Sequence, residues 1–445
     1  MIRSSITHSK IGPISKMFLR RFSTNGSVWN AYSPIFKEDE NLKDLRTSKF
    51  EYKSLYQPLK IDSFTSEIEN SSEKVDYYSH CLREEMKHYG NSEFQDEDRL
   101  NNTSSLPELR MIKTKNQAFE TYLIENPNVD PKSTVTKMKQ YVKFAVMFMK
   151  FFKLGVMNVW KNYRLNRKEF YGSYYMVDPK NENAKLKVKN LNSVIDELHT
   201  VINCERNVRN ASEQRRVLNK GGTQDLFPKI ELSRSTLQRV LRTRADFIKL
   251  PLFAVLFLLL EELTIGLCYI FPEIVPSTCE LPQLNHRFFY QQSKSQKELL
   301  ELRQNAPKSE LFKKTPYNIS CKELFVLSSV LKTKSSLIPT VLYPESYLRQ
   351  ALLRKLKSLN VDNYLIVRDG GVWKMTNLEI LRSCIDRGLV DFSKELNPNN
   401  DPQSEEQKSH YELIDFSTLR FRLHSFICEM NRSNNHASVG LLGMY

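Results

Sequence analysis

The longest apolar stretch of the chain, residues 250–271, is the feature that most limits how the chain can fold. As a helix with a rise of about 1.5 Å per residue it would measure roughly 33 Å, which matches a hydrocarbon core of about 30 Å. Lys249 can reach the membrane surface at one end, and Pro272 and Pro276 end the helix at the other. We therefore expect a single membrane-spanning helix at about residues 250–271.

Two adjacent acidic residues, Glu261 and Glu262, interrupt this run near its middle. If charged, they cost about 5 to 7 kcal/mol, which nearly cancels the roughly 6 kcal/mol that the apolar side chains contribute to insertion. They must then be protonated, paired or turned toward protein. Because a carboxylate can exchange a proton for a cation, both are candidates for ion coupling. Two alternatives remain: the pair binds lysines of a neighbouring helix, or the whole run is a buried core helix of a soluble domain.

The N-terminal residues are typical of a mitochondrial transit peptide. The chain contains no Asp or Glu before Glu38, while Ser, Thr and basic residues are frequent. The string Arg20-Arg21-Phe22 resembles a processing site. We expect residues 1–22 to be removed after import, and the alternative is a basic disordered tail.

A second apolar segment, residues 137–163, carries lysines at helical spacing along one side. They are Lys139, Lys143, Lys150 and Lys153. Such a helix is expected in a membrane interface or against the membrane-spanning helix, because four charges make a crossing costly. The alternative is an ordinary amphipathic core helix. Residues 132–310 are thus a membrane-associated region. Residues 23–131, rich in Asn, Ser and charged residues, are expected to be low-complexity and largely disordered, with short helices at most.

The overall charge and the motif content limit the function. The net charge of +15 favours an anionic partner such as RNA or acidic lipid. The seven cysteines form no Cys-x-x-Cys pair, and the sequence contains no nucleotide-binding, zinc-protease or hydrolase motif. We therefore expect a protein that is not an enzyme, with no catalytic residue, no metal site and no cofactor.

Residues 321–431 have the pattern of a compact helical domain, which a tail at 432–445 follows. Thr376 and Glu379 form a capping-box pattern at the start of one helix, and Gly388 is placed to end it.

Basic side chains are frequent in this domain, on both sides of a turn predicted at Gly370-Gly371. Four lie on an amphipathic helix and three on the adjoining elements: Arg349, Arg354, Lys355 and Lys357, then Arg368, Arg382 and Arg387. We expect them to form one cationic surface for an anionic partner. The alternative is that they are a solvated helix face without a partner.

Five basic residues precede the apolar run, on a helix that Ser233 is predicted to begin. They are Arg234, Arg239, Arg242, Arg244 and Lys249. By the positive-inside rule, this flank would lie in the mitochondrial matrix.

The chain resembles the LETM family of leucine-zipper and EF-hand transmembrane proteins of the mitochondrial inner membrane, over roughly residues 134–431. The shared residues around the membrane segment are Ala245-Asp246, Glu262, Phe271-Pro272 and Pro276-Ser277-Thr278. Those shared with the ribosome-binding domain of the family are Leu348, Leu352, Asp362, Leu378, Glu379, Cys384, Arg387 and Gly388. No EF-hand loop and no long heptad pattern follow, so calcium binding and zipper assembly are not expected.

The resemblance implies a place in the mitochondrial inner membrane and two activities. The first is binding of mitochondrial ribosomes, through rRNA or ribosomal proteins that meet the seven basic residues of 321–431, in support of synthesis and insertion of proteins made there. The second is potassium/proton exchange at Glu261 and Glu262, for which a single crossing would have to assemble into homo-oligomers. A membrane scaffold with neither activity is the third possibility. The family places its C-terminal domain in the matrix, and we follow the resemblance against the positive-inside rule.

Overall fold

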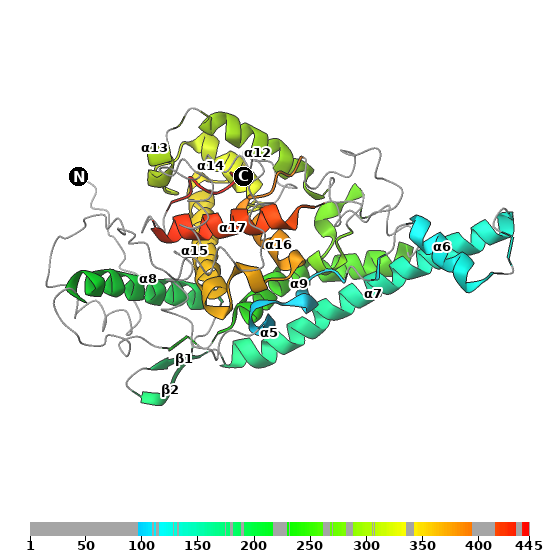
Figure 1. Cartoon of the computed structure of the whole chain (residues 1–445), viewed down its shortest axis with the longest axis horizontal. Helices are drawn as coiled ribbons and strands as arrows, with labels where there is room; N and C mark the ends of the chain where they lie inside the picture. The colour runs from blue at the N-terminus through cyan, green and yellow to red at the C-terminus, as the bar shows by residue number, and fades with distance from the viewer. Residues whose placement is uncertain are drawn as a thin grey trace, which may run out of the picture. The chain divides into compact units, whose positions relative to one another are not determined.

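The computed structural model describes residues 97–444 with interruptions, the longest of which fall at 217–228, 261–267, 335–341 and 394–413. Within the described residues the fold is mainly helical, as predicted, with one small sheet (Figure 1). The four longest helices are α7 (Thr134–Ser173), α8 (Leu191–Arg216), α9 (Arg234–Leu260) and α15 (Glu345–Asp369). The shorter helices of the C-terminal half are α12 (Tyr290–Arg303), α13 (Lys308–Lys313), α14 (Cys321–Val330), α16 (Asn377–Arg387) and α17 (Phe416–Arg432).

Helix α9 begins where the sequence predicts. The Ser233 hydroxyl accepts a hydrogen bond from the Thr236 backbone N–H at 3.2 Å, which satisfies one of the free donors of the first turn. Pro251 lies inside the helix, which continues to Leu260.

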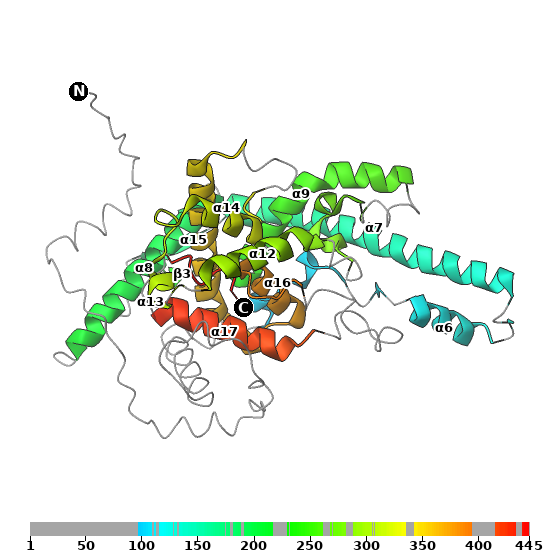
Figure 2. The same ribbon diagram turned by 90° about the horizontal axis from the view of Figure 1, so that it is seen from above.

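Helices α7 and α9 pack against each other, and the far end of α7 extends beyond α9 (Figure 2). Phe152 of α7 contacts Phe253 and Phe257 of α9, with ring centroids 5.9 and 6.0 Å apart. Gly155 of α7 allows the chain after the apolar run to approach closely, because a Cβ there would meet the Cys279 Sγ at 2.5 Å. The lysine-bearing segment therefore packs on α9, in the described residues.

The small sheet connects α7 to α9. It contains β1 (Tyr175–Asp178), β2 (Asn181–Lys187) and β3 (Lys229–Ile230), in the antiparallel order β2-β1-β3. The sequence analysis did not predict these strands.

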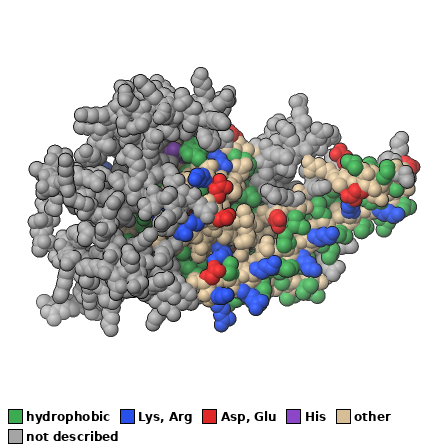
Figure 3. All heavy atoms as spheres, turned by 60° about the horizontal axis from the view of Figure 1, so that its bottom comes forward, with side chains coloured by type: hydrophobic (Ala, Val, Ile, Leu, Met, Phe, Trp, Pro, Cys, Tyr) green, Lys and Arg blue, Asp and Glu red, His purple; other side chains and the backbone are tan. Residues whose placement is uncertain are grey.

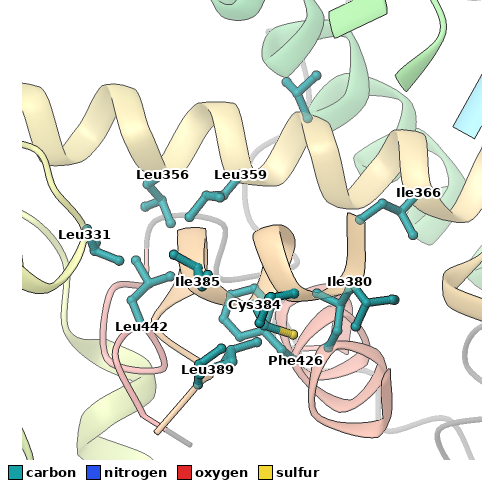
Figure 4. Packing of buried hydrophobic residues seen from close by; sticks show 14 of the residues in the cluster. Leu331, Leu356, Leu359, Ile366, Ile380, Cys384, Ile385, Leu389, Phe426 and Leu442 are labelled. Carbon is teal, nitrogen blue, oxygen red and sulfur yellow. The ribbon is translucent and has the colours of Figure 1, made fainter. Parts of the chain in front are cut away.

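The helices of the C-terminal half share one apolar core. In Figure 4, α15 lies across α16 and α17, with Leu359 above, Cys384 between and Phe426 below. This core is continuous with the buried residues of α7, α8 and α9.

The predicted turn and helix end of this half are confirmed, and the capping box is not. Gly370 and Gly371 have φ angles of 143° and 80°, which other residues rarely adopt, and Gly388 ends α16 with φ 69°. Thr376 precedes α16 without a side-chain capping bond. The carboxylate of Glu379 is instead bound elsewhere, as described below.

Two segments outside the long helices are more integrated than the sequence suggested. The short helices α5 (Glu97–Leu100) and η3 (Thr103–Ser105) fall within the expected disordered segment 23–131, yet Leu100 is fully buried. At the other end, the expected tail contributes Val439–Met444 to the core. The Arg303 side chain donates hydrogen bonds to three carbonyls of this segment, those of Val439, Gly440 and Leu442.

Candidate membrane-facing site

The C-terminal half of α9 presents an exposed, wholly apolar face. It consists of Ile248, Pro251, Leu252, Val255, Leu258 and Leu259, which we call the apolar face of α9. These positions recur at helical spacing, so they form one stripe along the helix. Leu258 and Leu259 are 71% and 73% exposed, which is unusual for leucines of a packed helix. On the opposite side of α9, Leu250 and Phe253 are buried, and Phe253 packs on Phe152 of α7.

Helix α7 presents a different exposed face, on which basic and apolar side chains alternate. The basic members are Lys139, Lys150, Lys153, Lys161, Arg164 and Lys168, and the apolar members are Val135, Val142, Val146, Met157 and Trp160. At 100° per residue all of them lie on one side of the helix, which we call the mixed face of α7. The helix contains only one acidic residue, Glu169. Figure 3 shows the basic and hydrophobic side chains interspersed over this surface.

An aromatic cluster lies where the apolar face of α9 begins. The rings of Tyr163 and Phe247 stack with centroids 3.8 Å apart, and Trp160 stacks on Phe247 at 6.2 Å. Trp160 remains half exposed. Tryptophan and tyrosine are the residues that gather at membrane–water interfaces, because they combine an apolar ring with a polar group.

Near this aromatic cluster, residues just before the apolar run are hydrogen-bonded to residues just after it. The buried Asp246 carboxylate accepts hydrogen bonds from the Ser277 backbone N–H at 2.8 Å and from its hydroxyl. Lys249 donates to the Val275 carbonyl at 3.2 Å. Burial raises the pKa of Asp246, although the bonds from Ser277 and the charge of Lys249 oppose the shift. Asp246 and Lys249 thus hold the segment after the run against α9.

A buried ion-pair network fixes the other end of α9 to the C-terminal helices. Arg242 donates to both carboxylate oxygens of Glu379, at 2.7 and 2.8 Å, and Arg234 binds Glu379 at 3.1 Å and Asp362 at 3.0 Å. The Asn102 backbone N–H also donates to Glu379. Burial alone would raise the pKa of Glu379, but the charges of Arg242 and Arg234 lower it below its ordinary value.

The basic flank of the apolar run is therefore largely used inside the protein. Arg234 and Arg242 are buried in ion pairs, Arg239 pairs with Glu169, and Lys249 is bound to Val275. Arg244 is the exposed member of the five. The positive-inside argument counted all five residues, but Arg234 and Arg242 are buried and face other parts of the protein.

The seven predicted ribosome-binding candidates do not form one surface. Arg387 is fully buried and donates to Asp362 and Asn363, and Arg368 is buried against Asp369 and two backbone carbonyls. Their expected exposure is wrong, because buried acids of the same helices neutralise them. Arg354 is exposed on α15.

The other four candidates are partly exposed and already bound. Lys355 pairs with Asp386, and Lys357 pairs with Asp196 of α8. Arg382 pairs with Glu280. Arg349 pairs with Glu345 and donates to the Ile319 carbonyl. Arg354, Lys355 and Lys357 remain neighbours on one stretch of α15.

Some predicted features lie outside the described residues, and two others can be assessed only within them. Glu261 and Glu262, the ion-coupling candidates, and the transit peptide 1–22 are outside them. Among the helices that the structure describes, none is both long enough and apolar enough to cross a membrane. In the same part of the chain, no group of His, Cys, Asp and Glu side chains is arranged to hold a metal ion.

Sequence reasoning missed the Asp246–Ser277 contact and the Glu379 network, although it named all three residues as parts of a resemblance. A signal was present: an Asp directly before an apolar run and a Ser-Thr pair directly after it are polar groups that need partners if they are buried.

The comparisons with known proteins give one result. The model of the pentamidine resistance factor domain, PNT1, matches residues 100–370, which is more than half of the chain. No curated protein and no solved structure matches the chain significantly. The likeness to the LETM family is not confirmed by these comparisons. The matched range begins at the buried Leu100 and ends at the turn after α15, so it contains α7, α9 and the Asp246–Ser277 contact. The chain belongs to the pentamidine resistance factor (PNT1) family.

Proposed function

We propose that the protein is a non-catalytic, membrane-bound protein of the mitochondrial inner membrane, which receives mitochondrial ribosomes in the matrix and supports the synthesis and insertion of proteins made there. The observation that carries the proposal is the apolar face of α9 next to the mixed face of α7. Exposed leucines on one helix and lysines with a half-exposed tryptophan on its neighbour fit a membrane surface better than water.

The fold gives this attachment a rigid connection to the rest of the protein. Arg234 and Arg242 hold α9 on α15 and α16 through Glu379 and Asp362. A buried, multiply bonded network of this kind resists movement, because each group that separates loses its charged partner. The C-terminal helices would therefore keep a fixed position above the membrane, which suits a receptor for a large partner.

The ribosome part of the proposal depends on the basic residues that remain accessible on α15. Arg354 is exposed, and Lys355 and Lys357 are only partly covered by their ion pairs. A ribosome is rich in phosphate, so contacts with such residues release counterions and weaken as salt increases.

The test is co-sedimentation of mitochondrial ribosomes with the full-length protein in detergent, across a salt series. We expect Arg354→Glu/Lys357→Glu to reduce binding and to flatten its dependence on salt. The matched control is Lys294→Glu/Lys297→Glu, which makes the same charge change on exposed positions of α12. Equal sedimentation of the wild type and the α15 variant would contradict ribosome binding through this helix.

The alternative, potassium/proton exchange, depends on Glu261 and Glu262, and no contact between described residues favours it. Potassium flux across mitochondrial membranes that is unchanged in Glu261→Gln/Glu262→Gln would exclude that alternative.

A further inference from the structure

We propose that α7 and α9 lie along the surface of one leaflet of a membrane that contains acidic phospholipid, and that the apolar run does not cross it. The apolar face of α9 would lie among the acyl chains, and the lysines of the mixed face of α7 would lie at the level of the lipid phosphates. This inference rests on the membrane attachment proposed above and adds its geometry and its lipid class.

The first argument is the position of the two ends of the run. A crossing helix would separate the residues before it from those after it by about 30 Å. Asp246 and Ser277 are instead 2.8 Å apart, from carboxylate oxygen to backbone nitrogen. From Asp246 to Leu260, α9 spans only about 21 Å at a rise of roughly 1.5 Å per residue. The chain therefore enters and leaves the apolar run on the same side.

The second argument is the neighbour that α9 has along this length. Phe152 of α7 packs on Phe253 and Phe257 in the first half of the apolar run. Lys150 and Lys153 flank Phe152 and are exposed. Because α7 keeps these charges beside the apolar face of α9, neither helix can enter the hydrocarbon core deeply without burying them. A helix pair in the interface, inserted to a depth of about 5 to 10 Å, accommodates both faces.

The third argument is the charge around the apolar surface, which decides between two occupants. A second copy of the chain could cover the apolar face in a symmetric dimer, but it would bring another basic helix beside α7, whose only acid is Glu169. An acidic bilayer complements the lysines and covers the leucines at the same time. Trp160, half exposed and stacked on Phe247, lies where an interfacial aromatic is expected.

The experiment is flotation of the full-length protein with vesicles of phosphatidylcholine alone or mixed with phosphatidylglycerol. We expect Leu258→Glu/Leu259→Glu to lower binding to both vesicles at least about tenfold, because it places charges among acyl chains. We expect Lys150→Glu/Lys153→Glu to lower binding about tenfold on the acidic vesicles only. The matched control is Leu342→Glu, an exposed leucine next to α15, which should bind like the wild type.

A second measurement tests the topology directly. Single cysteines are introduced at two exposed positions on either side of the run, Arg244→Cys and Lys294→Cys, in a Cys321→Ser background, because Cys321 is exposed. Vesicle-bound protein is treated with a membrane-impermeant maleimide, and modified peptides are identified by mass spectrometry. Equal modification at both positions is the expected result.

The outcomes separate the inference from the proposed function. Protection of one position and modification of the other would show a crossing, which overturns the one-leaflet arrangement and leaves membrane attachment standing. A wild type that binds neither vesicle would overturn both. A dimer in solution that Leu258→Glu/Leu259→Glu dissociates, together with no vesicle binding, would assign the apolar face to a second copy.

Discussion

Asp246 and Ser277 join the two ends of the most apolar segment of the chain, with the buried carboxylate accepting the Ser277 backbone N–H and hydroxyl. The contact holds the residues after the run against α9 and next to Gly155 of α7. Burial of the Asp246 carboxylate raises its pKa, because the charged form is less stable away from water. The stability of the folded protein should therefore depend on pH through Asp246.

We predict that Asp246→Asn preserves the fold and changes how its stability depends on pH. The raised pKa means that folded Asp246 holds its proton more tightly than unfolded Asp246. Its contribution to stability is thus complete below the unfolded pKa of about 3.9 and is lost as the pH rises through the raised folded value. Asparagine does not titrate, so the free energy of unfolding of the variant, relative to the wild type, should increase from pH 4 toward neutral, as urea titrations in detergent can measure.

The matched variant Asp246→Leu also does not titrate, but it should lower the free energy of unfolding at every pH. It leaves the buried Ser277 backbone N–H without an acceptor, which costs about 1 to 3 kcal/mol. If Asp246→Asn were destabilised as much as Asp246→Leu, the charge rather than the hydrogen bonds would hold the two ends together.

The Glu379 network gives a second prediction. Glu379→Gln leaves Arg234 and Arg242 buried beside a neutral side chain, so we expect the free energy of unfolding to fall by about 3 to 5 kcal/mol. Because the folded pKa of Glu379 is lowered, its contribution is present above the unfolded pKa of about 4.3 and is lost as the pH falls through the folded value. Chemical denaturation at neutral and acidic pH measures both effects.

A surface ion pair provides the control for this measurement. Arg239 and Glu169 are 2.7 Å apart, but the Glu169 side chain is half exposed. Glu169→Gln should therefore cost less than about 1 kcal/mol. A similar loss in Glu169→Gln and Glu379→Gln would mean that burial adds little to the network.

The local features of the fold could be predicted from the sequence, and the long-range ones could not. Ser233, the Gly370-Gly371 turn and Gly388 act on neighbouring residues, so their effect is visible in a short window. Arg368 and Arg387 were interpreted as part of an exposed cationic surface, because basic residues at helical spacing look the same whether they meet water or a buried acid. The acid that Arg387 meets is Asp362 on α15, and only the packing of α15 on α16 brings the two together.

The candidate site shows the same division. The apolar run and the lysines of α7 were recognised from composition and period alone, and in the described residues both contribute side chains to the exposed surface. The contact between Asp246 and Ser277 was not predicted, because 31 positions separate them in sequence and a straight helix through the run would keep them apart. The prediction of a single crossing assumed that straight helix.

The N-terminal segment, which lies outside the described residues, carries a third prediction. If residues 1–22 direct import, Arg20→Glu/Arg21→Glu should leave the protein outside mitochondria, because transit peptides depend on basic residues and exclude acidic ones. Cell fractionation and the length of the imported chain measure this. Normal import and normal processing of the variant would remove the basis for the proposed location.

The final residues of the chain carry the last prediction, which concerns Gly440. A Cβ at this position would lie 1.9 Å from the Leu311 carbonyl oxygen, a contact that cannot exist without moving backbone. The Gly440 carbonyl also accepts a hydrogen bond from Arg303 at 2.8 Å, so the segment cannot shift freely.

Gly440→Ala should therefore destabilise the protein by about 1 to 3 kcal/mol through overpacking, despite the general advantage of alanine over glycine. The control is Lys313→Ala on the exposed side of α13, for which we expect a change within about 0.5 kcal/mol. Thermal unfolding of both variants decides the matter, because an unchanged midpoint in Gly440→Ala would show that Val439–Met444 does not pack in the core as described.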